Sequence, residues 1–251
     1  MRCSRARRTI LVTLGTVALV AASTCVAILA QDQPKTTSAS AKKDEVFYSA
    51  KVVKSTLGDK PLVLLRGAVT FTHKDTVLTS DEVTYDKKTN VATSPAKVNI
   101  SDPECDISGD KGTANFDKKL GVLEGNITML AKPKPDATAD KDSPRAKMTK
   151  PTTVTCPKVE YLYKTKIATL SGPVSFRQEK RSGSADKAVY DGKAEILTLT
   201  GNVNGLDEDG QTFKATRLRM SLKKGDEWME AENANASFKV DLEEDSAPEK
   251  K

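Results

Sequence analysis

Apolar and polar residues alternate along most of this chain between residues 45 and 240, as where Thr70 separates Val69 from Phe71. No stretch in this region keeps a helical period for three turns. A period of two residues gives a strand one buried face and one hydrated face. The pattern therefore predicts a nearly all-β protein made of antiparallel strands.

Two short patterns recur at a spacing of about 30 residues, which is typical of stacked supersecondary units. The first is a polar lead-in, an alternating strand that ends in an aromatic residue, and then Asp with lysine. It occurs as SDEVTYDKK from Ser80, GDKGTANFDKK from Gly109 and SADKAVYDGK from Ser184. The second is an apolar strand entered through a glycine. It occurs as LRGAVTF from Leu65, LEGNITM from Leu123, LSGPVSF from Leu170 and LTGNVNG from Leu199.

The repeated glycines and aspartates predict local geometry. Glycine inside a strand pattern indicates a β-bulge or a close backbone approach, which we expect at Gly67, Gly125, Gly172 and Gly201. Aspartate after a strand accepts hydrogen bonds from backbone N–H groups two residues on, which we expect at Asp86, Asp117 and Asp191. Short turns of this kind connect antiparallel strands.

The ends of the chain and one internal segment differ from the repeats. Four arginines precede the 22 uncharged residues from Thr9 to Ala30, so residues 1–30 are expected to form an apolar helix. That helix is either a membrane anchor formed by residues 9–30 or a signal peptide that is cleaved. Residues 31–44 read as a linker, residues 131–151 as a disordered insertion rich in Pro and Lys, and residues 241–251 as a disordered tail.

Charge and cysteine content limit the function classes. Residues 31–251 hold 36 basic and 34 acidic side chains, a net of only +2, which argues against a nucleic-acid partner. Cys3 and Cys25 lie in the leader, and Cys105 and Cys156 lie in the repeats. An exported protein permits a disulfide between Cys105 and Cys156, although two separate half-buried thiols are the alternative.

Candidate chemistry is sparse. The sole histidine, His73, and two cysteines cannot form a His-rich metal site. Asp81, Asp110 and Asp186 hold equivalent repeat positions and could bind calcium or cleave a polysaccharide, but adjacent lysines favour turn and solvent-facing roles. We therefore expect no catalytic residue, metal or cofactor.

The apolar face of the predicted sheet is the remaining candidate site. It either packs shut as a dry core or leaves a trough in which each buried CH₂ of a ligand contributes about 0.8 kcal/mol. By parity and central position, the residues expected to line such a groove are Val69, Phe71, Val83, Tyr85, Phe116, Ile127, Val174, Phe176 and Val203.

The alternation of glycine-entered strands with segments such as SDEVTYDKK resembles the OstA/LptA/LptC family of lipopolysaccharide-transport proteins, over roughly residues 46–240. The resemblance implies a twisted antiparallel β-jellyroll whose sheets clasp lipid acyl chains in the cell envelope. It also implies edge-strand pairing with other Lpt-type jellyrolls, for which residues 46–53 and 234–240 are the candidate edges. The insertion at residues 131–151 departs from the family pattern.

These observations predict a non-enzymatic periplasmic protein that binds lipopolysaccharide or a related glycolipid and helps bridge the inner and outer membranes. The N-terminal helix would hold it at the inner membrane, unless cleavage releases it to the periplasm. Two other functions stay open. A structural or adhesive repeat protein would have a closed core, and a carbohydrate-active β-helix would need longer parallel strands and a cluster of carboxylates.

Overall fold

A computed structural model of the chain describes residues 46–237, except residues 57, 59, 60, 104, 133–149 and 224. All regular structure in this part of the chain is β-strand, arranged in one antiparallel sheet, which confirms the predicted fold class. Within these residues no helix is long and apolar enough to cross a membrane. The expected N-terminal helix, the linker at 31–44, the tail at 241–251 and most of the insertion at 131–151 lie outside the described residues.

The strands follow the repeats along the chain. They are β1 (Phe47–Ser49), β2 (Val52–Ser55), β3 (Leu62–His73), β4 (Thr76–Asp86), β5 (Val91–Ser94), β6 (Val98–Ser101), β7 (Cys105–Gly109), β8 (Lys111–Asn115), β9 (Leu120–Ala131), β10 (Thr152–Leu162), β11 (Ile167–Gln178), β12 (Arg181–Asp191), β13 (Ile196–Leu206), β14 (Thr212–Ser221), β15 (Trp228–Glu232) and β16 (Asn235–Ala236).

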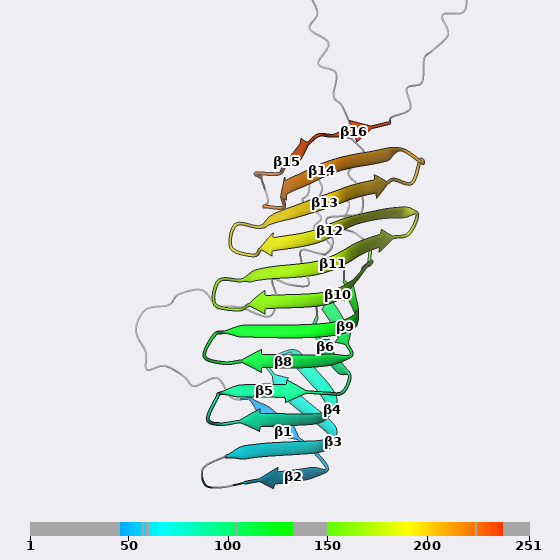
Figure 1. The fold of residues 1–251 in the computed structure, drawn as a ribbon. Helices are drawn as coiled ribbons and strands as arrows, with labels where there is room; N and C mark the ends of the chain where they lie inside the picture. Colours follow the sequence, from blue (N-terminus) through cyan, green and yellow to red (C-terminus); the bar gives the residue numbers. More distant parts are fainter. Residues whose placement is uncertain are drawn as a thin grey trace, which may run out of the picture.

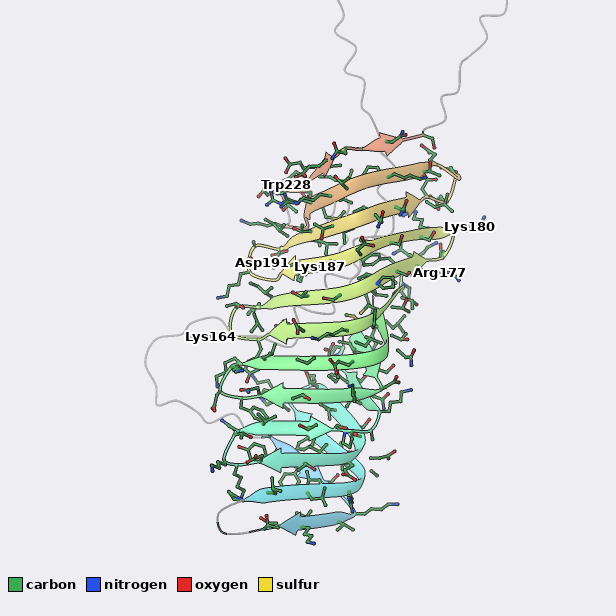
Figure 2. The ribbon with its side chains drawn as sticks, in the orientation of Figure 1. Lys164, Arg177, Lys180, Lys187, Asp191 and Trp228 are labelled. Atoms are coloured by element: carbon green, nitrogen blue, oxygen red, sulfur yellow. The ribbon has the colours of Figure 1, made fainter. Side chains whose placement is uncertain are left out.

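The sheet bends along its length into two leaves, and the long strands run through both (Figure 1). Leaf 1 has the order β2-β3-β4-β5-β8-β9-β10-β11-β12-β13-β14-β15. Leaf 2 has the order β1-β3-β4-β6-β7-β9-β10-β11-β12-β13-β14-β16. Lys164 and Asp191 lie at the turns that close the outer end of leaf 1. Lys180 lies at a turn at the opposite end of the strands (Figure 2).

In β3, β9, β11 and β13 the corner between the leaves is a β-bulge at a glycine of the second repeat pattern. In β3 the buried residues Leu65 and Val69 are four positions apart, whereas their partners on β4, Val83 and Ser80, are three apart. The bulged strand thus carries one extra residue, which bends it and keeps its apolar side chains on the inner face. Register shifts at the equivalent places in β9, β11 and β13 confirm the predicted bulges.

The corners also explain the repeated aspartates. At Gly201, with φ of 73°, an added Cβ would lie 2.3 Å from Asp186 Oδ2, so only glycine lets the aspartate cross the bend. Asn202 Nδ2 donates a 2.9 Å hydrogen bond to the same oxygen. The corner at Gly125 repeats this with Asp110, whose Oδ2 accepts a 2.7 Å bond from Asn126. These two aspartates therefore hold the bend of the sheet.

The inward-facing residues of β4 differ from those that simple alternation predicts. Sequence parity places Val77 on the same face as Val83 and Tyr85, but β4 changes parity at its corner. Leu78, which pairs with the inward Phe71, takes the inner position instead.

The turns at Asp86 and Asp191 form as expected, each Oδ1 accepting two backbone N–H groups.

The third turn is built differently. Asn115 Oδ1 accepts from the Lys118 N–H at 2.8 Å. Asp117 instead accepts a 2.6 Å hydrogen bond from the side chain of Asn90, which lies in the turn between β4 and β5. The aspartate at this turn therefore joins two neighbouring turns rather than closing its own.

Candidate functional site

The inner face of leaf 2 carries one continuous apolar row, in which each residue pairs directly with the next across the strands. The leaf-2 row consists of Tyr48, Phe71, Leu78, Ile100, Ile107, Met129, Val154, Phe176, Gly183, Gly205 and Phe213. Residues opposite each other on one face touch. The row therefore crosses every long strand as an apolar track, which lacks side chains at Gly183 and Gly205.

Leaf 1 carries a matching row near its turn ends. The leaf-1 row consists of Val63, Tyr85, Ala92, Ala114, Gly121, Tyr161, Ala168, Tyr190, Leu197, Met220 and Met229. The two rows lie on the inner faces of the leaves, and their buried members from β7 onward belong to the main hydrophobic core.

Burial changes along both rows. From β9 onward most members are buried, as Met129, Val154 and Leu197 show at 0–1% exposure; Gly121, Gly183 and Met229 are half-buried. From β3 to β8 most members are only half-buried, including Phe71, Leu78, Ile100, Tyr85 and Ala92, whereas Ile107 on β7 is buried. The inner apolar surface is thus accessible at its N-terminal end and covered further along.

Small residues lie at the boundary between these two parts. Ala92, Ala114 and Gly121 follow one another in the leaf-1 row between Tyr85 and Tyr161. With strands about 4.8 Å apart, the two tyrosines stand on strands about 19 Å apart. An added Cβ at Gly121 would meet no atom within 4 Å, so the inner face is open there.

The structure divides the nine predicted groove residues. Phe71 and Tyr85 are half-buried in the accessible part, and Phe116 is 40% exposed in the turn after β8. The rings of Tyr85 and Phe116 meet edge-on at 5.8 Å. The other predicted residues face inward and are at most 6% exposed: Val69, Val83, Ile127, Val174, Phe176 and Val203. In this state those six form core and not an open groove, since side chains of the same cores pack around them.

The groove residues predicted from the sequence do not include Ala92, Ala114 and Gly121, because only bulky apolar side chains were expected to line the groove. Ala114 does share its parity with Phe116, so the signal was present. What the sequence could not show was that Ala92, Ala114 and Gly121 become neighbours across separate strands.

Two polar groups in the interior are perturbed by burial. The Tyr161 hydroxyl has no hydrogen-bond partner, and burial raises its pKa. Cys156 is a free buried thiol whose pKa burial raises to about 11. The possible bridge from Cys105 to Cys156 is therefore not formed in this structure.

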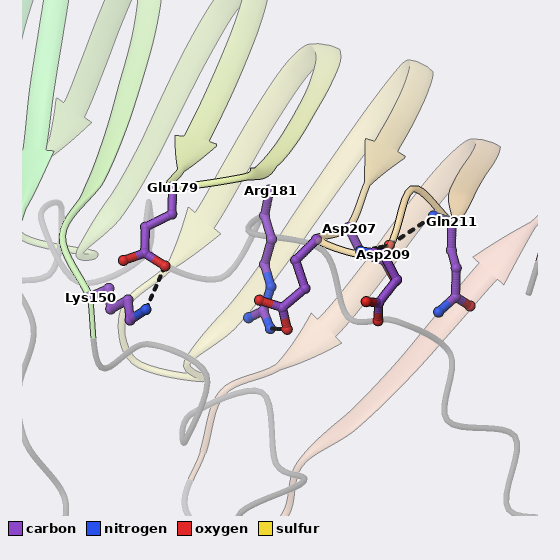
Figure 3. A network of polar contacts seen from close by, with 7 residues as sticks. Lys150, Glu179, Arg181, Asp207, Asp209 and Gln211 are labelled. Atoms are coloured by element: carbon purple, nitrogen blue, oxygen red, sulfur yellow. Dashed lines mark hydrogen bonds and ion pairs between the residues drawn. The ribbon is translucent and has the colours of Figure 1, made fainter. Parts of the chain in front are cut away.

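The outer face of leaf 2 is polar. A concavity of about 620 Å³ lies there. It is lined by polar residues such as Thr155, Ser175 and Arg177 and by four members of the leaf-2 row, Phe176, Gly183, Gly205 and Phe213. At the end of the same leaf, exposed ion pairs join neighbouring connections, among them Lys150 with Glu179 and Arg181 with Glu208 (Figure 3). Exposed pairs contribute little stability, about 0–1 kcal/mol each. The concavity therefore borders the leaf-2 row, whereas the ion pairs lie away from both rows.

Both side edges of the sheet are open among the described residues. β1 and β2 pair only with β3, and β15 and β16 pair only with β14. The first edge is unusually apolar, with exposures of 52–65% for Val46, Phe47, Tyr48, Val52 and Val53. At the other edge, Asn235–Ala236 falls inside the expected 234–240 segment, and β15 adds an edge segment that the sequence did not predict.

The described residues offer no group of His, Cys, Asp and Glu that could hold a metal ion. His73 is half-buried at the end of β3, and Asp110 and Asp186 act at the corners.

Comparison with known proteins gives one family match. The model of the family described as LptA/(LptD N-terminal domain) LPS transport protein matches residues 67–226, more than half of the chain. None of the curated proteins matches the sequence. Among solved structures, LptH, the LptA homologous periplasmic component of the conserved lipopolysaccharide transport device from Pseudomonas aeruginosa, is 17% identical. It aligns over 63% of this chain and 83% of its own, with a TM-score of 0.31. The chain belongs to the LptA/LptD N-terminal domain family of lipopolysaccharide transport proteins.

Proposed function

We propose that this protein carries the acyl chains of lipopolysaccharide, or of a related glycolipid, between its two leaves as part of a bridge from the inner to the outer membrane. The observation that carries the proposal is the pair of apolar rows, which are continuous across the strands and half-exposed at one end. Moving a lipid through water requires such a surface, because each CH₂ shielded from water contributes about 0.8 kcal/mol. The chain's family supports the same ligand.

The accessible part from β3 to β8 is the proposed entry. There Phe71 and Tyr85 would contact the acyl chain first, with Phe116 at the rim and Val69 and Val83 beneath. Ile127, Val174, Phe176 and Val203 would join the contact surface only where the chain displaces the side chains that now bury them. The ligand is bound and not transformed, so the proposed role is non-enzymatic.

The open edges supply the proposed contacts with other Lpt-type jellyrolls. An exposed edge strand offers a row of unpaired N–H and C=O groups that a second sheet can extend. The apolar side chains of β1 and β2 would be covered when a partner's edge pairs with them. Periplasmic placement follows from this role, and residues 9–30 would then be an inner-membrane anchor or a cleaved leader. Sequencing the N-terminus of the mature protein separates these two fates.

Photocrosslinking in cells tests the binding surface. A benzophenone amino acid at Phe71, which faces inward, should capture lipopolysaccharide, whereas the same group at the adjacent outward-facing Thr72 should not. A second pair, Phe176 and Ser175, reports whether lipid reaches the buried part. Capture only from the outward positions would refute the proposal.

A structural or adhesive role is the second candidate, and the full burial of Val174 and Phe176 favours it. A protein with a permanently closed core would purify under native conditions without lipid. Mass spectrometry of the extracted lipid decides between the two functions, because a carrier should retain acylated glycolipid.

A further inference from the structure

The hydroxyl of Tyr161 is an unusual group to place on the inner face of leaf 1. Tyr161 is 3% exposed, and its hydroxyl oxygen has no hydrogen-bond partner. Buried tyrosine hydroxyls normally find a partner, since leaving one unpaired destabilises the fold. Phenylalanine would fill the same space without that penalty, so core packing alone does not account for the tyrosine.

The neighbours of Tyr161 leave room beside it. Its direct partners across the strands are Gly121 on β9 and Ala168 on β11. Neither has a side chain larger than a methyl group. On the Gly121 side no atom lies within 4 Å of the position that a Cβ would take. Tyr161 therefore stands next to the open stretch of the leaf-1 row.

We infer that Tyr161 determines ligand specificity, its hydroxyl bonding to an oxygen carried on the acyl chain of the ligand. The chain would lie over Ala92, Ala114 and Gly121, and the oxygen would belong to a hydroxyl or an ester group. A phenol both donates and accepts hydrogen bonds, so either group satisfies it. A plain hydrocarbon chain would leave the hydroxyl unpaired and would bind less tightly. This inference rests on the proposed function.

Binding of two matched fatty acids tests the inference. Dodecanoic acid and 3-hydroxydodecanoic acid compete for the purified protein against a fluorescent acyl probe, below their micelle concentrations. Wild-type protein should prefer the hydroxylated acid by about fivefold, the value of one ordinary hydrogen bond. Tyr161→Phe should lose that preference and bind dodecanoic acid as the wild type does. The control Tyr163→Phe, which loses a 3.4 Å bond to the Phe116 carbonyl, should keep the preference.

The outcomes separate the two proposals. A preference that survives in Tyr161→Phe, or its absence from the wild type, overturns the role of Tyr161 while leaving acyl-chain binding intact. Failure of both acids to bind the wild type overturns the proposed function, and the inference with it. Tyr161→Phe should also melt at or above the wild-type temperature; a lower value would show that the hydroxyl is already paired in the free protein.

Discussion

Replacing Gly201 with alanine tests whether the glycine corners hold the two leaves together. The backbone there has φ of 73°, and a left-handed conformation costs an L-residue about 1–2 kcal/mol. The new Cβ would also lie 2.3 Å from Asp186 Oδ2 and 2.9 Å from its Cβ. Forcing atoms into an occupied site costs about 1–3 kcal/mol. We expect Gly201→Ala to lower the free energy of unfolding by roughly 2–5 kcal/mol.

Two other glycines provide matched controls. Gly210 has φ of 79° but no atom within 4 Å of an added Cβ, so Gly210→Ala should cost only the backbone strain of about 1–2 kcal/mol. Gly121 has neither a positive φ nor an atom close to an added Cβ. Gly121→Ala should therefore be neutral or stabilise the fold by up to about 1 kcal/mol. Urea denaturation followed by circular dichroism, with the slope compared among variants, measures all three.

The order of the three variants is the decisive result. If Gly201→Ala costs no more than Gly210→Ala, the close approach of Asp186 does not restrict the corner and the reasoning fails. Adding Asp186→Gly to Gly201→Ala provides a further check, because it removes the atoms that the new Cβ would meet. The double variant should then lose less stability than the two single losses combined.

Three more predictions concern other parts of the molecule. Burial raises the pKa of Cys156 from 9.0 to about 11, so the unfolded thiol ionises first and stability should fall between those pH values. The free energy of unfolding should fall by at most about 1.4 kcal/mol per pH unit. Urea titrations at several pH values should show a weaker pH dependence for Cys156→Ala. Gly121→Leu should fill the open space and weaken fatty-acid binding in the competition assay, whereas the outward control Val122→Leu should not; equal effects would place the ligand elsewhere. Val53→Lys should block pairing at the β2 edge and reduce end-to-end association in sedimentation experiments, while Leu130→Lys, on a central strand, should leave it unchanged.

The fold class and the sites where the strands bend could be predicted from the order of the amino acids alone. A period of two residues fixed which side chains face inward within each half of a strand, because successive side chains point to opposite faces. Gly201 inside the alternating pattern indicated a bulge, since glycine in a strand interior is typical of bulges and close backbone approaches. These signals lie within a few residues of one another, so they can be read locally.

The accessibility of the inward residues and the contacts of the repeated polar residues depend on how distant strands pack together. Phe71 and Phe176 have the same local pattern, yet one is half-buried and the other is 1% exposed. Burial depends on what packs across the leaves, and no local pattern contains that information. The open stretch beside Tyr161 likewise exists because strand register aligns Ala92, Ala114 and Gly121, which the sequence separates by whole strands and turns.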